Sequence, residues 1–234
     1  MSYKRCLLAF LLIPLIVFAV FPSVASGDCG GYWAYGYHES VQDVSGYYYG
    51  AYARNYVDRY PITVGSSSSH VNSVGVKRAD GTTWAELGWI AYSAGTPIYF
   101  RARQYRYSWN IDHYDIRSVF PGGFDQSFLL HWHRGTYPNN VWESHIGGKA
   151  EGYYVLPEPY GLTNGIAIAN SERHKLYPCD TNYGHFWSLQ KSNYYDQWSY
   201  WGNTQPRVPD GDDPQYWTRI WTEWNGPHFQ SLLK

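Results

Sequence analysis

The chain has 234 residues and a formal net charge of −1, with 25 Tyr and 12 Trp but only 16% charged residues. Such a nearly neutral chain has no electrostatic basis for binding nucleic acid or an anionic lipid surface. Tyr and Trp combine a flat apolar ring with a polar edge, so they suit a packed core and also the binding of sugar rings or other proteins.

Residues 1–26 have the features of a secretory signal peptide: Lys4 and Arg5, then an apolar run, then small residues. The apolar run is shorter than the ~20 residues that span a bilayer, so we expect cleavage and secretion, and no membrane span. Removing these 26 of the 234 residues leaves 208, which carry a formal charge of −3 without Lys4 and Arg5. That length suits one domain, and we expect a lead-in over 27–46 and a single domain over 47–234.

The cysteines predict one disulfide. Cleavage would remove Cys6 and leave Cys29 and Cys179. Two cysteines in an oxidising compartment are expected to pair, and this bond would join the start of the mature chain to a late part of the domain.

From residue 47 onward the sequence has the pattern of an antiparallel β-sandwich. Runs rich in Tyr, Val, Ile, Phe and Trp recur at short intervals, with Gly, Pro, Asn and Asp between them. The runs that we expect to form strands are 47–60, 70–77, 82–92, 97–107, 114–119, 127–134, 141–146, 165–174 and 184–190.

One short C-terminal helix is also predicted. Asp213 can cap it, and the proline that follows suits a first helical turn. Four large apolar residues then recur at helical spacing: Trp217, Ile220, Trp221 and Trp224. The same residues alternate acceptably as a strand, so both interpretations stay open.

Five segments carry a resemblance to known families: AELGWI (85–90), PIYFRAR (97–103), FLLHWHRGTYPNNVWESHIGG (128–148), IAIANSE (166–172) and GHFWSLQ (184–190). In this order they resemble secreted concanavalin A-like β-sandwich proteins of unassigned function and, more distantly, the neprosin-type glutamic peptidases. The resemblance implies an all-β jelly roll. It also aligns the peptidase glutamates with Glu86 and Glu172, with Asn170-Ser171-Glu172 in the place of a Gly-Gly-Glu stretch.

Glu86 and Glu172 are the candidate catalytic residues. Each lies within an expected strand, where an ionised carboxylate is rarely buried without a partner. If both faced one groove, they could divide the roles of general acid and general base, as peptidase or glycosidase chemistry requires. The alternative is that each lies on a solvated face or pairs with an arginine.

Four residues of one expected hairpin are candidate metal ligands: His131, His133, Glu143 and His145. Each pair shares one face of its strand, and the two strands together could supply nitrogen and oxygen ligands for zinc or copper. A shift of one residue in the register would remove the site, so the alternative is a polar hairpin face, and we predict no cofactor.

Five further residues are candidates for ligand binding. Arg101 and Arg103 share a strand face and could bind carboxylate or sulfate groups of an acidic glycan, although such arginines also stack on tyrosines or pair with acids. Trp84 shares the face of Glu86, and Trp198 and Trp201 could form a platform for a sugar ring or lie in the core.

Two functions follow from these residues. The first is binding of a glycan or another extracellular polymer through Tyr- and Trp-rich faces. The alternative is an acid-active hydrolase, peptidase-like or glycosidase, that uses Glu86 and Glu172. A structural or adhesive protein in which the tyrosines only pack is a third interpretation, and the sequence indicates no oligomeric state.

Overall fold

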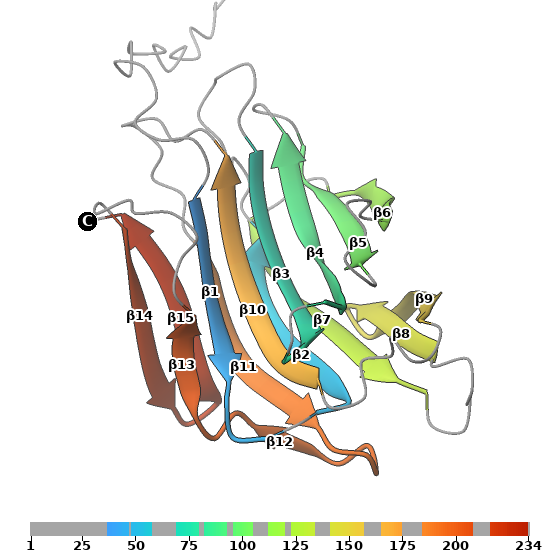
Figure 1. The fold of residues 1–234 in the computed structure, drawn as a ribbon. Helices are drawn as coiled ribbons and strands as arrows, with labels where there is room; N and C mark the ends of the chain where they lie inside the picture. The colour runs from blue at the N-terminus through green and yellow to red at the C-terminus, as the bar shows by residue number, and fades with distance from the viewer. Residues whose placement is uncertain are drawn as a thin grey trace, which may run out of the picture.

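The structure, a computed structural model, describes residues 37–46, 48–57, 69–79, 82–92, 96–104, 112–119, 123–133, 141–156, 165–174, 184–207 and 216–233 (Figure 1). Within these ranges every regular element is a strand, and no helix could cross a membrane. The strands are β1 (Tyr37–Asp43), β2 (Gly50–Val57), β3 (Ser69–Arg78), β4 (Trp84–Tyr92), β5 (Ile98–Gln104), β6 (Asp112–Ser118), β7 (Phe124–Trp132), β8 (Val141–Ile146), β9 (Lys149–Val155), β10 (Gly165–His174), β11 (His185–Ser192), β12 (Trp198–Tyr200), β13 (Thr204–Arg207), β14 (Tyr216–Glu223) and β15 (Gly226–Leu233).

The strands form two antiparallel sheets that pack face to face. The seven-stranded sheet has the order β13-β1-β10-β3-β4-β5-β6. The eight-stranded sheet has the order β14-β15-β11-β2-β7-β8-β9, and β12 pairs with β11. Figure 1 shows β1, β10, β3 and β4 in front of β2 and β7. The predicted all-β sandwich is confirmed.

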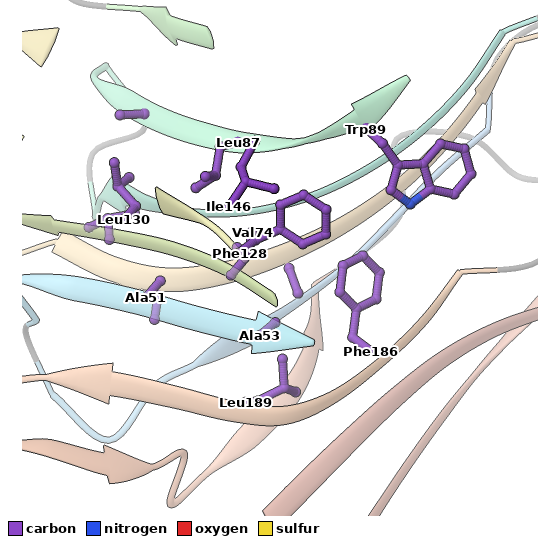
Figure 2. Packing of buried hydrophobic residues seen from close by; sticks show 14 of the residues in the cluster. Ala51, Ala53, Val74, Leu87, Trp89, Phe128, Leu130, Ile146, Phe186 and Leu189 are labelled. Atoms are coloured by element: carbon purple, nitrogen blue, oxygen red, sulfur yellow. The ribbon is translucent and has the colours of Figure 1, made fainter. Parts of the chain in front are cut away.

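Alternate residues of each strand fill the space between the sheets. Leu87 and Trp89 on β4 are fully buried, as are Phe128 and Leu130 on β7 (Figure 2). In Figure 2 the strand that carries Leu87 and Trp89 bows towards the core. Side chains alternate between the two faces of a strand, so Glu86 points to the outer face, on the inside of this bend.

A buried ion pair ties the two sheets together. Lys191 on β11 donates to Asp43 Oδ2 at the end of β1 over 2.7 Å, and also to Ser45 Oγ and Tyr48 Oη. Burial favours the neutral carboxyl group, but the hydrogen bonds from Lys191 and Ser45 outweigh this effect and lower the pKa of Asp43. The pair is therefore ionised at neutral pH and has lost nearly all contact with water.

The predicted C-terminal helix is wrong, because residues 216–223 form β14. This strand pairs with β15 from Tyr216 opposite Leu233 to Glu223 opposite Gly226. A two-residue turn at 224–225 joins the strands, and Gly226 has a φ of 100°. The Asn-Gly pair that we interpreted as a helix stop is part of a hairpin. The ladder to β15 therefore outweighs the helical spacing of the tryptophans.

Two strands lie where none was predicted. β1 falls within the expected lead-in over 27–46 and pairs with β10, so part of that segment belongs to the sandwich. β9 follows Gly147 and Gly148, whose φ angles of 62° and 78° are those that a tight hairpin turn requires at both central positions. The two glycines therefore connect β8 to another strand.

We expect Lys191→Met to destabilise the fold by about 3–5 kcal/mol at neutral pH, because it leaves the buried Asp43 carboxylate without its partner. Lys149→Met is the matched control, since the Lys149 side chain is 73% exposed. Urea denaturation gives both values.

The pH dependence follows from the lowered pKa of Asp43. Its stabilisation is present above the unfolded-state pKa of about 3.9 and is lost as the pH falls through the folded-state value. The difference between Lys191→Met and wild type should therefore shrink in acid. An equal difference at acidic and neutral pH would argue against this role for the pair.

Candidate functional site

The outer face of the seven-stranded sheet holds a hydrogen-bonded carboxylate. Glu86 on β4 accepts from Ser73 Oγ over 2.6 Å and from Asn170 Nδ2 over 3.1 Å, both at Oε2. Ser73 lies directly opposite Asn170 in the β3–β10 ladder, and Gly75 lies opposite Glu86 in the β3–β4 ladder. Donors from two neighbouring strands therefore fix the orientation of this carboxylate and stabilise its ionised form.

Glu172 lies on the same outer face, on β10. Strand β3 separates it from β4, and along β3 Glu172 faces Val71 while Glu86 faces Gly75. Burial raises the pKa of Glu172, and the charge of Lys77 opposes this only in part. We call the surface around Glu86, Ser73, Asn170 and Glu172 the acid face. It combines one carboxylate held by donors with one that retains its proton at higher pH.

Apolar side chains surround Glu86 on the same surface. Ile90 on β4 and Phe100 on β5 are buried there, and Val71 and Trp84 pack against them. The Trp84 indole donates to Gln104 Oε1 over 2.7 Å. Trp84 is thus part of the wall beside Glu86.

Four residues on the eight-stranded sheet form a second polar group, the His–Glu cluster of His131, His133, Glu143 and His145. His131 on β7 lies opposite Glu143 on β8, as the candidate metal site required. Three imidazole Nε2 atoms approach Glu143 Oε2, at 3.3 Å for His131, 2.6 Å for His133 and 3.1 Å for His145. The His133 hydrogen bond is the main reason that the pKa of Glu143 falls to about 2, whereas burial lowers the pKa of His131.

The two candidate arginines bind backbone carbonyls of β9 and lie away from the acid face. Arg101 donates to the Tyr153 carbonyl over 3.4 Å and lies 5.0 Å from the Tyr114 ring, and Arg103 donates to the Val155 carbonyl over 2.5 Å. Both therefore help to hold β9, and the stacking of Arg101 on a tyrosine matches the alternative that the sequence left open.

The expected tryptophan platform is wrong in part. Trp201 is only 4% exposed, packs in the core and donates to the Gln190 carbonyl, so it cannot stack on a ligand. Trp198 is half-buried and donates to Asp196. Cys29 and Cys179 lie outside the described residues.

An aromatic cluster that we did not predict lies next to β12. It consists of Tyr49, Trp132, Tyr194 and Tyr195, with ring centroids 5.3–5.4 Å apart between neighbours. Tyr195 is 65% exposed and Tyr194 is 42% exposed. The cluster brings together residues from three distant parts of the chain, so no local sequence pattern indicated it. Ser73 was also missed, although its position between the outward-facing Val71 and Gly75 placed it on the acid face.

Comparison with known proteins shows the fold. No protein-family model and no curated protein matches the chain. Scytalido-glutamic peptidase, solved with a peptide-based transition state analogue, has 10% identity and a TM-score of 0.58, over 86% of this chain and 98% of the peptidase. SCP-B, an Eqolisin-family peptidase in complex with the tripeptide Ala-Ile-His, has 11% identity and a TM-score of 0.56, over 87% and 98% of the two chains. The chain therefore shares the β-sandwich fold of glutamic peptidases.

We expect Lys77→Met to raise the pKa of Glu172 further, because it removes the positive charge that opposes the effect of burial. Titration of the Glu172 carboxyl carbon by NMR measures this directly. Lys149→Met, on β9, serves as the control and should leave the titration unchanged. A pKa of Glu172 that falls in Lys77→Met would contradict the assigned electrostatics.

Proposed function

We propose that the protein is a secreted, acid-active hydrolase, with Glu86 as general base and Glu172 as general acid. The observation that carries the proposal is the placement of two glutamates on one face of one sheet in opposite electrostatic environments. Glu86 accepts two hydrogen bonds that favour its ionised form, while burial raises the pKa of Glu172. Two acids whose environments differ in this way can take the two roles in the same pH range.

The chemistry follows from these roles. Glu86 would accept a proton from a water molecule, and the resulting nucleophile would attack the carbonyl carbon of an amide. Glu172 would give its proton to the departing nitrogen, so that the amine leaves in neutral form. Ser73 and Asn170 would keep the Glu86 carboxylate oriented towards the water. The shared fold with two glutamic peptidases supports a peptide as the substrate.

The protonation states set the pH range. Activity needs Glu86 ionised and Glu172 protonated, and deprotonation of Glu172 removes the general acid. We therefore expect hydrolysis of a denatured protein to be fastest in acid and to decline as the pH rises through the pKa of Glu172.

The test compares wild type with Glu86→Gln and Glu172→Gln, which keep the shape of each side chain. We expect each change to lower kcat/KM by about 10²–10⁴-fold, and the double variant to lose little more, because the two acids act as a unit. Glu223→Gln, an exposed change on β14, is the matched control. Wild-type activity that survives either substitution on the acid face would refute the assignment.

The aromatic cluster favours a second function, binding of a glycan or another extracellular polymer. Tyr194 and Tyr195 present exposed rings beside Trp132 and Tyr49, and a flat apolar surface with polar edges suits a sugar ring. This surface is separate from the acid face, because its residues belong to β7 and to loops next to β2 and β11 of the eight-stranded sheet.

We expect Tyr195→Ala to weaken binding to a soluble polysaccharide several-fold, since stacking on one ring contributes on the order of 1 kcal/mol. Tyr153→Ala is the matched control, because Tyr153 is also 65% exposed but lies on β9. Quenching of tryptophan fluorescence across a panel of polysaccharides measures the affinities. Equal losses in the two variants, or no binding by wild type, would remove this second function.

A further inference from the structure

The register of one hairpin brings three imidazoles and a carboxylate to a single point. His131 lies opposite Glu143, and His145 lies opposite Leu129, two residues before His131 on β7. The hairpin also carries His133, which directly follows β7. β7 and β8 lie beside each other in Figure 1, and their alternate residues Phe128, Leu130 and Ile146 face the core. The His–Glu cluster therefore lies on the outer face of the eight-stranded sheet.

The ligand atoms are close enough to share one ion. One ligand atom each from His131, Glu143 and His145 lies within 4.8 Å of the others. A zinc ion bound at about 2.0–2.1 Å from each atom would require separations of about 3.3 Å in tetrahedral geometry. Small rotations of the three side chains therefore close the site without any movement of the strands.

One nitrogen of the cluster has no hydrogen bond among the described residues. The Nε2 atom of His145 is shielded from solvent, and although Glu143 Oε2 lies 3.1 Å away, the two are not aligned for a hydrogen bond. A buried polar atom in this condition requires an explanation, and a bound ion is one of the usual ones. Coordination of a metal would satisfy this nitrogen where the cluster itself does not.

The surroundings of His131 also suit a metal ligand. Its Nδ1 atom lies 3.9 Å from Asp196 Oδ1, on the side of the ring away from Glu143. A carboxylate behind a ligating histidine favours the proton on Nδ1 and leaves the Nε2 lone pair for the ion. Asp196 has a φ of 59° in the turn after β11, where its backbone N–H donates to the Asn193 carbonyl.

We infer that His131, Glu143 and His145 bind one divalent transition-metal ion, with His133 as a further ligand or as a hydrogen-bond partner of Glu143. Imidazole nitrogens with one carboxylate oxygen are typical ligands of zinc, copper and nickel, whereas calcium and magnesium require mainly oxygen ligands. The side chains of His131, Glu143 and His145 are 20–25% exposed, so solvent can reach the ion. Three protein ligands with access to solvent are typical of zinc sites that keep an open position.

The experiment uses the whole protein after treatment with a chelator and its removal. ZnCl₂, NiCl₂ and MgCl₂ are titrated separately at neutral pH by calorimetry, and native mass spectrometry gives the stoichiometry. We expect one zinc or nickel ion per chain with a micromolar or tighter Kd, a higher Tm with zinc, and no comparable binding of magnesium.

Substitutions locate the site. We expect His131→Gln and His145→Gln each to weaken zinc binding by at least about 100-fold, and Asp196→Asn to weaken it by about 10-fold through the orientation of His131. His113→Gln, on β6 of the other sheet, is the matched control and should bind as wild type does. Circular dichroism of each metal-free variant establishes that it folds.

Two results would overturn the inference. One is the absence of stoichiometric zinc or nickel binding by the folded wild type, and the other is binding that persists unchanged in both His131→Gln and His145→Gln. Neither result bears on the acid face, because Glu86 and Glu172 lie on the other sheet. The metal site and the hydrolase therefore stand or fall separately.

Discussion

The alternation of side chains along paired strands is the constraint on which the structure depends. Each sheet must give one face to a dry core, so a polar residue has a function available only if its position places it on the outer face or if it finds a partner inside. On β4, Leu87 and Trp89 fill the core while Glu86 points outward. On β7, Phe128 and Leu130 do the same while His131 points outward. Both candidate sites exist because the core residues beneath them fix the register.

Polar groups that do lie between the sheets are paired, and their pairing joins the two layers. Lys191 and Asp43 connect β11 to β1, and the Trp89 indole on β4 donates to the Asn55 side chain on β2. Each contact links strands of different sheets, so it specifies how one sheet is positioned on the other. Removal of one partner would leave a buried polar group whose desolvation nothing compensates.

Much of the fold could be predicted from the sequence, because β-branched and aromatic runs between turn residues are a local signal. That signal failed where two periods fit the same residues: Trp217, Trp221 and Trp224 match a helical spacing, and only the ladder from β14 to β15 decides for a strand. It also failed for Trp201, because burial depends on which strand covers a side chain and not on the side chain itself. The His–Glu cluster was visible as a set of residue types, but its geometry depended on a register that the sequence does not encode locally.

The same residue type has opposite properties on the two outer faces, and the cause is local. Hydrogen bonds from His133 and His145 bring the pKa of Glu143 to about 2, so this side chain is an anion throughout the range in which proteins normally work. Burial raises the pKa of Glu172, so this side chain holds a proton to higher pH than an exposed glutamate does. A permanent anion among imidazoles suits the binding of a cation, whereas a carboxyl group that retains its proton suits proton donation. The different environments of Glu143 and Glu172 therefore explain why one face of the sandwich is assigned to metal binding and the other to acid–base chemistry.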